Sequence, residues 1–402
     1  MAGIAALAAT YILSQFYRTF LAVLTPTLSL EIGATKSDLS LASGLWFVAF
    51  ALMQFVVGVA LDRFGPKRTV SFLLAIFAAG GAFVFALASA PWMIVLAMVM
   101  IGIGCSPVLM GSFYIFAKTF PPARFAVLAS WIVAIGMLGN VAGSSPMANA
   151  AEYFGWRNVM WGLGIITLVA SIVLYLAIRD PETGEGDAAD DGGFSGYLQL
   201  VKIRALWLIF PMMLINYVAA AGIRGLWAGP YLADVYTADA LQIGTVTLYM
   251  ALAMVAGSFL YGPLDMVFRT RKWVVVAGNL ICGAACAWLA LNTQASIFAV
   301  TVAFIVIGIS GSSFALMMAH GRAFFPLHLT GRGVTLMNFF GIGGVGLMQV
   351  VTGQIVASST DPATPAAAYS NLFGFYALTI AGALLIYLFS RDMKPEIAKP
   401  AG

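Results

Sequence analysis

Charged residues are scarce in this chain of 402 residues: Asp, Glu, Lys and Arg together make up 9% of it, with two histidines and three cysteines. Soluble domains carry about 25% charged residues on average. Hydrophobic residues reach 61%, and the mean hydropathy is +0.96. The composition therefore excludes a soluble multidomain enzyme and indicates an integral membrane protein.

The few cysteines, acids and histidines limit the chemistry that the chain can support. Cys105, Cys282 and Cys286 fall in apolar stretches and form neither a disulfide framework nor a metal-ligand set. No cluster of acids or histidines suits metal or acid–base chemistry, such as that of a membrane lipid transferase. We therefore expect no cofactor, no metal and no enzymatic activity. The isoelectric point near 8.9 reflects basic loops and implies no nucleic-acid partner.

Hydropathy predicts an all-α polytopic membrane protein with twelve transmembrane helices, since each needs about 20 apolar residues. The predicted spans lie near residues 3–26, 39–60, 69–89, 92–117, 125–146, 158–178, 205–229, 241–263, 273–293, 297–319, 333–354 and 368–390. The first begins almost at the N-terminus, has no basic leader and is longer than a signal peptide core, so we expect it to be retained.

A polar stretch divides these spans into two groups of six. Residues 179–204 are rich in Gly, Asp and Glu and have too little apolar surface to fold alone. The predicted organisation is an N-terminal half at 1–178, a cytoplasmic linker at 179–204, a C-terminal half at 205–390 and a cytoplasmic tail at 391–402.

Basic residues are distributed unevenly between the two sides of this topology. With the N-terminus inside, sixteen Lys and Arg residues lie on the inner side, and only Lys36 and Arg157 lie outside. Such a bias follows the positive-inside rule. We therefore expect both termini in the cytoplasm, and the compact loops favour a bacterial inner (plasma) membrane.

The two halves repeat one another at a spacing of about 205 residues. The equivalent positions are Arg18 and Arg224, Asp62 and Asp265, Lys67-Arg68 and Arg271-Lys272, Phe120-Pro121 and Phe325-Pro326, and Arg179-Asp180 and Arg391-Asp392. Because each half starts inside and has an even number of spans, the repeats are parallel and related by an axis along the membrane normal.

The loop between the second and third spans carries a charged motif, Gly58-Val-Ala-Leu-Asp62-Arg63-Phe-Gly65-Pro-Lys67-Arg68. It resembles the signature loop of the major facilitator superfamily, Gly-x-Leu-x-Asp-Arg-x-Gly-Arg-Lys, with Ala60 and Pro66 as departures. The resemblance implies that this loop is part of a gate, in which Asp62 closes the cytoplasmic side against a helix N-terminus of the other half. Asp265 is its counterpart in a degenerate second copy. Alternatively, the basic residues only determine the topology.

The fifth span contains Gly139-Asn140-Val-Ala-Gly143. This segment resembles the Gly-Pro-x-x-Gly element of antiporters, with Asn140 in place of proline. Close packing of helices through small residues explains the spacing equally well.

Two arginines lie inside predicted spans, whereas all sixteen acids map to loops or span ends. Arg18 and Arg224 occupy equivalent positions in the first and seventh spans, which face each other across the central cavity of a 6+6 transporter. An ionisable group there costs about 2.5–3.5 kcal/mol on insertion scales and is a functional candidate. Since Arg binds carboxylate and phosphate bidentately, a bound anion is the natural partner. The alternative is that both arginines bond to backbone carbonyls or extend towards the outer interface.

Five further residues are candidates for the same site. Tyr11 and Tyr217 each precede an arginine by seven residues, which places them on nearly the same helix face. Gln15 lies one turn from Arg18, and Asn216 and Trp227 flank the equivalent region of the seventh span.

Tyr11, Arg18 and Pro26 reproduce the first-span spacing of the organophosphate and organic-anion branch of the superfamily, and Arg224 stands at the matching place in the seventh span. The chain is thus similar to a branch in which these two arginines grip the substrate. Thr19 stands where the phosphate antiporters have a second basic residue, and the fifth span has no histidine. The resemblance implies a small organic anion, bearing either carboxylate or phosphate.

A proton relay through a buried acid is not expected, and we assign His320 and His328 to the cytoplasmic surface. The predicted function is secondary active transport of an anion by rocker-switch alternating access, as an antiporter or as a symporter whose substrate carries the proton. The alternatives are a proton-driven exporter of amphipathic compounds and a substrate sensor that does not transport. We expect a monomer whose partners are the anion and the lipid bilayer.

Overall fold

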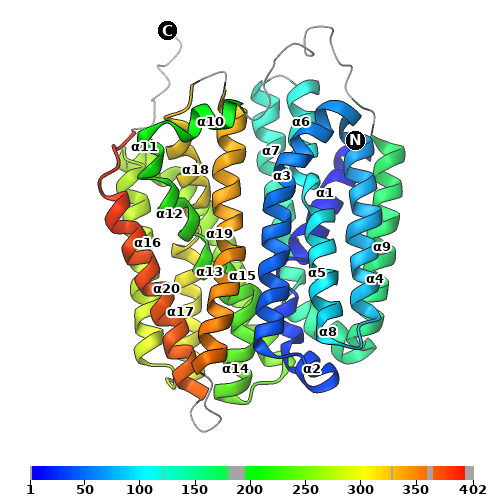
Figure 1. The fold of residues 1–402 in the computed structure, drawn as a ribbon, viewed down its shortest axis with the longest axis vertical. Helices are drawn as coiled ribbons and strands as arrows, with labels where there is room; N and C mark the ends of the chain where they lie inside the picture. Colours follow the sequence, from blue (N-terminus) through cyan, green and yellow to red (C-terminus); the bar gives the residue numbers. More distant parts are fainter. Residues whose placement is uncertain are drawn as a thin grey trace. The chain divides into compact units, whose positions relative to one another are not determined.

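The computed structural model describes residues 2–120, 122–178, 180, 195–326, 329–359 and 365–393. All regular structure in this part of the chain is helical (Figure 1). Nine of the described helices are long and apolar enough to cross a membrane, and two bent helix pairs raise the number to as many as eleven. The seventh predicted span, built from shorter helices, accounts for the twelfth. The predicted all-α polytopic fold is confirmed.

The six N-terminal spans contain α1 (Ala2–Phe16), α2 (Leu21–Ile32), α3 (Lys36–Leu73), the π-helix η1 (Leu74–Ala79), α4 (Gly80–Ala86), α5 (Pro91–Cys105), α6 (Pro107–Thr119), α7 (Pro122–Ala142), α8 (Ser145–Phe154) and α9 (Trp156–Ala177). The remainder contains α10 (Ser195–Val201), α11 (Arg204–Trp207), α12 (Phe210–Ile215), α13 (Val218–Gly222), the π-helix η2 (Ile223–Trp227), α14 (Ala228–Tyr236), α15 (Ala240–Phe268), α16 (Lys272–Leu291), α17 (Ile297–Ser310), α18 (Phe314–Arg322), α19 (Thr330–Ser359) and α20 (Pro365–Tyr387). Most of the predicted linker lies outside the described residues, and its end forms α10.

Local sequence signals determine the ends of several helices. Gly33 ends α2 with φ +65°, a left-handed conformation that glycine adopts without steric cost. Thr35 then begins α3 through a capping box, in which its Oγ1 accepts from the Asp38 N–H and its own N–H donates to the Asp38 carboxylate. Gly65, with φ +77°, separates the second span from the third inside α3.

The first and seventh spans are interrupted where the sequence predicts continuous helices. The axes of α1 and α2 differ by 50°, and residues 17–20 between them form a turn. The seventh span comprises four short α-helices and η2. Breaks and π-helical turns within spans are frequent at functional sites, and here each interruption includes one of the two intramembrane arginines.

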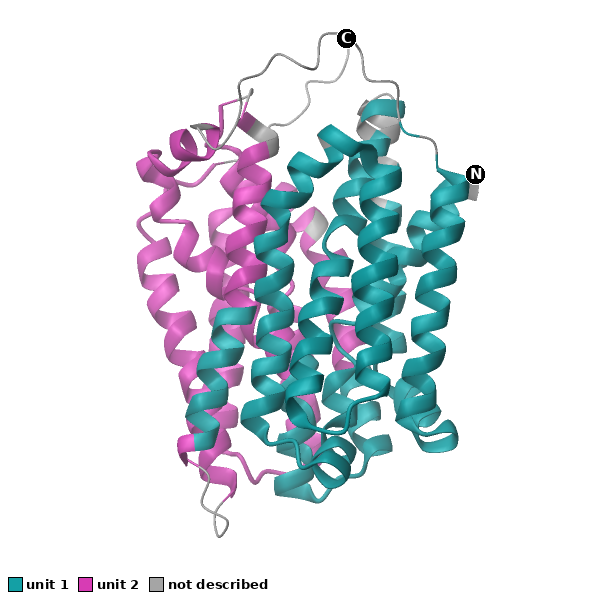
Figure 2. Cartoon of the chain, turned by 45° about the vertical axis from the view of Figure 1, so that its right-hand side comes forward, with its two compact units in different colours: residues 1–190, 224–248, 346–357 teal, residues 191–223, 249–345, 358–402 magenta. Residues whose placement is uncertain are grey.

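The helices form two compact units, coloured separately in Figure 2. Unit 1 comprises residues 1–190, 224–248 and 346–357, and unit 2 comprises residues 191–223, 249–345 and 358–402. Parts of the seventh, eighth and eleventh predicted spans thus pack with the N-terminal helices. The two units are groups of segments that contact one another. The halves at 1–178 and 205–390 are defined by the sequence repeat and stay a prediction.

Small residues let helices approach closely within each unit. In unit 1, α1 packs against α7, and a Cβ added at Gly139 would overlap the carbonyl oxygen of Ile12. A Cβ at Gly143 would likewise meet Thr19 Oγ1. The segment from Gly139 to Gly143 therefore serves close helix packing, which was one of its two interpretations beside the antiporter-like element. In unit 2, α16 packs against α20 and α17.

Candidate anion-binding site

Arg18 lies in the turn between α1 and α2, where its backbone N–H donates to the Gln15 carbonyl at 3.4 Å. Its guanidinium carbon lies 5.3 Å from the ring centre of Trp46 and 4.7 Å from that of Phe50, both on α3. These distances fit cation–π contacts, which hold the side chain without neutralising its charge. Arg18 Nε is buried and has no hydrogen-bond partner among the described residues.

Arg224 lies in η2 and is 3% exposed. Its Nη2 donates to the side-chain Oδ1 of Asn140 at 3.0 Å, and its Nη1 lies 3.5 Å from the Asn140 carbonyl oxygen. Two nitrogens of one guanidinium therefore meet two neutral oxygens of a single residue on α7. This arrangement is similar to a bidentate Arg–carboxylate pair, but the partner carries no charge.

The two arginine-bearing segments meet inside unit 1. A Cβ added at Gly225 would lie 3.1 Å from the carbonyl oxygen of Arg18. Four residues further on, a Cβ at Gly229 would overlap the carbonyl oxygen of Ala22 on α2. The glycines on one face of the seventh span thus allow backbone contact with the first span beside both arginines.

The other five candidate residues divide between the two units. In unit 1, Gln15 Nε2 donates to the Tyr11 hydroxyl at 2.8 Å, and the buried Trp227 donates through Nε1 to Thr352 Oγ1 at 3.0 Å. Asn216 and Tyr217 belong to unit 2. Asn216 Oδ1 accepts from Ser313 at 2.6 Å, and the Tyr217 ring packs edge-on against Phe314. Their predicted role beside the arginines stays a prediction.

The structure adds contacts that the sequence analysis did not identify. Asn140 was attributed to helix packing or an antiporter motif, yet it contacts Arg224. Lys36 and Arg157, the two basic residues predicted outside, each form an ion pair: Lys36 with Asp234 of α14, and Arg157 with Glu31 of α2. The isolation of these two basic residues on the predicted outer side is the signal that could have pointed to acidic partners there.

The predicted gating loop is fixed by an acid from the end of the sixth span. A Cβ added at Gly65 would lie 2.6 Å from the Asp180 carboxylate carbon, and the Lys67 N–H donates to Asp180 Oδ1 at 2.8 Å. The Lys67 ammonium lies 4.4 Å from the ring centre of Tyr175. The side chain of Asp62 lies outside the described residues, so its predicted latch stays a prediction.

Other residues of this loop are more exposed. A Cβ added at Gly58 would meet no atom within 4 Å. The Arg63 guanidinium lies 5.6 Å from the Phe64 ring centre, and the Arg68 side chain is exposed.

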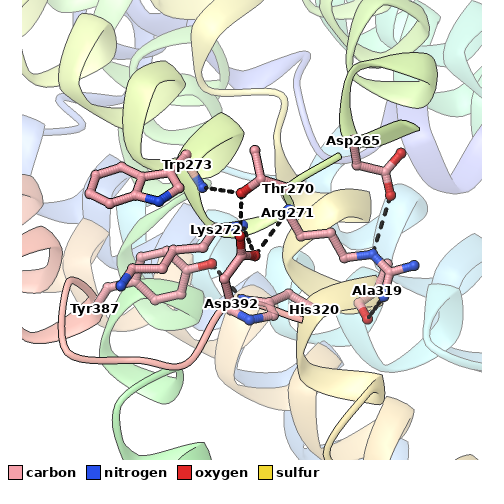
Figure 3. Close-up of polar contacts among 9 residues, drawn as sticks. All are labelled: Asp265, Thr270, Arg271, Lys272, Trp273, Ala319, His320, Tyr387 and Asp392. Carbon is pink, nitrogen blue, oxygen red and sulfur yellow. Dashed lines mark hydrogen bonds and ion pairs between the residues drawn. The ribbon is translucent and has the colours of Figure 1, made fainter. Parts of the chain in front are cut away.

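The second copy of the loop is organised in the same way within unit 2 (Figure 3). Asp392 accepts hydrogen bonds from Thr270 Oγ1 at 2.5 Å and from the backbone N–H groups of Arg271 and Lys272 at 3.3 and 3.1 Å. Burial raises the pKa of Asp392, but these three hydrogen bonds, together with the nearby His320, outweigh it and hold the pKa below its ordinary value. Asp265, the predicted gating residue, pairs with Arg271 Nε at 3.2 Å.

His320 is fully buried, which corrects its assignment to the surface. Nδ1 lies 2.6 Å from the Tyr387 hydroxyl (Figure 3). Nε2 lies 2.9 Å from the Arg391 carbonyl oxygen. Because a carbonyl only accepts, Nε2 donates to it. The final turn of α18 is thereby tied to the end of α20, a long-range contact that hydropathy does not report. His328 lies outside the described residues.

With this geometry established, comparison with known proteins identifies the class. The family model described as Major Facilitator Superfamily matches residues 7–226, more than half of the chain. The chain belongs to this superfamily, which confirms the resemblance seen in the loop motif. It is therefore a multi-pass membrane protein of a transporter family and not an enzyme.

Individual relatives agree with this class. The chain is 23% identical over 388 residues to a probable sulfoacetate transporter of Cupriavidus necator, covering 92% of this chain and 90% of the relative. It is 22% identical over 338 residues to a probable L-galactonate transporter of Escherichia coli, covering 75% and 72%.

Solved structures show the same fold. A bacterial homologue of the human lysosomal transporter Spinster, in an inward-facing and occupied conformation, has a TM-score of 0.77 and 18% identity, covering 96% of both chains. A D-xylose-proton symporter has a TM-score of 0.76 and 14% identity, covering 96% of this chain and 97% of that one.

Proposed function

We propose that the protein transports a small organic anion across the bacterial inner membrane by alternating access. The observation that carries the proposal is the meeting of the Arg18 and Arg224 segments in unit 1, with Arg224 held by the neutral Asn140. A guanidinium that lies against aromatic rings and a guanidinium that donates to a neutral amide suit a carboxylate, phosphate or sulfonate as a further partner. The names of the two relatives support this choice, since sulfoacetate and galactonate are anions.

Transport would proceed by exchange of anions or with a proton carried by the substrate, because the sequence places no acid inside a span. The halves at 1–178 and 205–390 would rock about the site, with both termini in the cytoplasm and the protein acting as a monomer. The Lys36–Asp234 pair joins the start of α3 to α14, on the predicted outer side. Opening to that side requires this contact to break, so it contributes to one state only.

Thermal stabilisation of the purified protein tests the binding step. Small carboxylates, sulfonates, organic phosphates, cations and neutral amphipathic compounds are each added to wild type, Arg18→Gln and Arg224→Gln. A ligand that binds the folded state raises the melting temperature. At a ligand concentration of 100 times Kd, the free energy of unfolding increases by about 2.7 kcal/mol. We expect at least one anion to stabilise wild type and neither variant. Arg204→Gln removes an exposed arginine of α11 and is the matched control.

Two results would contradict the proposal. If only cations or neutral compounds stabilise the protein, the exporter alternative is favoured. If anions stabilise both arginine variants as they do wild type, the arginines are structural. Uptake of the stabilising anion into proteoliposomes then separates a transporter from a sensor, because a sensor binds the anion without moving it.

A further inference from the structure

A groove lies between α3, η1 and α9 on unit 1, and neither Arg18 nor Arg224 lines it. Its volume is about 620 Å³, within the range of about 300–1,000 Å³ that is typical of ligand sites. The lining is almost wholly apolar and includes Met53, Val56, Phe72, Ala75 and Ile172. Val56 and Phe72 are among the exposed apolar residues of the unit, as expected for a surface that faces lipid.

The length of the groove matches one leaflet of a bilayer. Phe64 and Arg68 line it next to the charged loop, and Met53 and Ala75 line it deeper in the two spans. Phe64 is eleven residues from Met53, which corresponds to about 16 Å along a helix at about 1.5 Å per residue. Half of a hydrocarbon core of about 30 Å is about 15 Å. An acyl chain therefore fits the groove lengthwise.

One end of the groove is cationic. Arg68 lines this end, is exposed, and forms no hydrogen bond or ion pair with any residue of the described chain. Lys67 and Arg63 lie beside it in the same loop, where the basic residues outnumber Asp180, the carboxylate that accepts from the Lys67 N–H. Ser71, which lines the groove further in, is 5% exposed, and its Oγ has no hydrogen-bond partner among the described residues. An available guanidinium at the interface and a polar atom below it favour a ligand with an anionic head and an apolar tail.

We propose that this groove binds an anionic phospholipid, with one acyl chain between α3 and α9 and the phosphate against Arg68. A free phosphate would gain only one solvent-exposed ion pair, which contributes little. A neutral lipid would fill the apolar groove but leave Arg68 without a counter-charge. The inference depends on the membrane location of the protein and not on the identity of its substrate.

Lipid titration of the delipidated full-length protein in detergent tests the proposal. Phosphatidylglycerol and phosphatidylcholine with the same acyl chains are added separately, and binding is followed by the melting temperature and by native mass spectrometry. We expect wild type to bind phosphatidylglycerol more tightly than phosphatidylcholine, and Arg68→Gln to bind phosphatidylglycerol about fivefold more weakly than wild type. Arg204→Gln, the same change at an arginine that does not line the groove, should behave as wild type.

The apolar part of the site is tested with the charges in place. Ala75→Trp fills the groove and should abolish the stabilisation by phosphatidylglycerol; Ala60→Phe is a second variant in case the first does not fold. Equal binding of the two lipids by wild type overturns the proposal, as does a loss that is the same for Arg68→Gln and Arg204→Gln. Stabilisation by glycerol phosphate that Arg68→Gln removes also overturns it, because the site would then take a free phosphate.

Discussion

Asn140 offers a direct test of the anion site, because it holds Arg224 without neutralising it. Replacing it by Asp keeps the size of the side chain and places a carboxylate where the amide oxygen lies, 3.0 Å from Arg224 Nη2. The guanidinium would then have an anionic partner at this position in the absence of substrate. We therefore expect Asn140→Asp to bind anions much more weakly than wild type while remaining folded.

The expected loss of anion affinity in Asn140→Asp follows from the strength of the contact between Arg224 and the introduced carboxylate, which a substrate would have to replace. Two unit charges about 4 Å apart attract by about 4 kcal/mol at an effective dielectric constant near 20, and the cost of burying both charges offsets part of this attraction. Hydrogen bonds to charged groups contribute about 1.5–3 kcal/mol net. Since about 1.4 kcal/mol is a factor of ten, Kd for the anion should rise roughly 10- to 150-fold.

Isothermal titration with an anion that stabilises wild type measures this change, and Asn140→Ser is the control. Serine removes a neutral hydrogen bond that a bound anion would replace, so Kd should stay the same or fall. Wild-type affinity in Asn140→Asp would refute the reasoning, because Arg224 would then not contact the anion. An equal loss in both variants would show that Asn140 acts only through helix packing.

Three further predictions concern the contacts around this site and the gating loops. Gly225→Val adds a Cβ that would lie 3.1 Å from the Arg18 carbonyl oxygen. It should lower the melting temperature and weaken anion binding through overpacking strain of about 1–3 kcal/mol. Gly162→Val is the control, because nothing lies within 4 Å of its Cβ, and it should change neither the melting temperature nor anion binding. Lys36→Glu should slow anion uptake into proteoliposomes, and combining it with Asp234→Lys, which reverses both charges, should restore uptake. The coupling energy between the two side chains should be about 0.2–1 kcal/mol because both are partly exposed. No recovery in the double variant would show that the pair does not act in transport. Asp392→Ala should lower the free energy of unfolding at pH 7 by about 0.5–2 kcal/mol through loss of the helix cap. Because the pKa of Asp392 in the folded state lies below the ordinary value of 3.8, the greater stability of wild type should disappear only as pH falls through that lowered pKa. Equal melting temperatures of the two proteins at pH 7 would contradict this role.

The membrane spans could be predicted from the sequence because the bilayer imposes a fixed length of apolar residues. Their interruptions could not. Residues 17–20 and 223–227 are as apolar as their neighbours apart from one arginine each, and hydropathy averages over about 19 residues. At these interruptions Arg18 contacts α3 and Arg224 contacts α7, and contacts at such a long sequence separation do not enter a hydropathy average.

The candidate site was predictable to the same limited extent. Arg18 and Arg224 stand out because a charge in an apolar span is costly and both occupy repeat-equivalent positions. Asn140 does not stand out, since an amide between two glycines also suits helix packing. The cation–π partners Trp46 and Phe50 belong to a span in which aromatic residues are common, so nothing in the local pattern marks them.

The gating loops show how the sequence repeat becomes a repeated contact. Arg179-Asp180 and Arg391-Asp392 repeat at the ends of the sixth and twelfth spans. In unit 1 the Lys67 N–H donates to Asp180, and in unit 2 the Lys272 N–H donates to Asp392. A carboxylate at a helix N-terminus is stabilised by the unpaired N–H groups and the helix dipole. Each carboxylate therefore joins the last span of a half to the third span of the same half.

Each of these two contacts joins the third span of one predicted half to the end of the last span of the same half, so rocking of the halves does not have to break it. A contact biases the alternation only when it is present in one state and absent in the other. Asp180 and Asp392 are thus expected to keep each loop in shape throughout the proposed cycle. Lys36–Asp234 joins segments of different predicted halves and is expected to break when the predicted outer side opens. Substitutions at Asp180 or Asp392 should accordingly change stability more than the balance between inward-open and outward-open states. Substitutions at Lys36 or Asp234 should do the reverse.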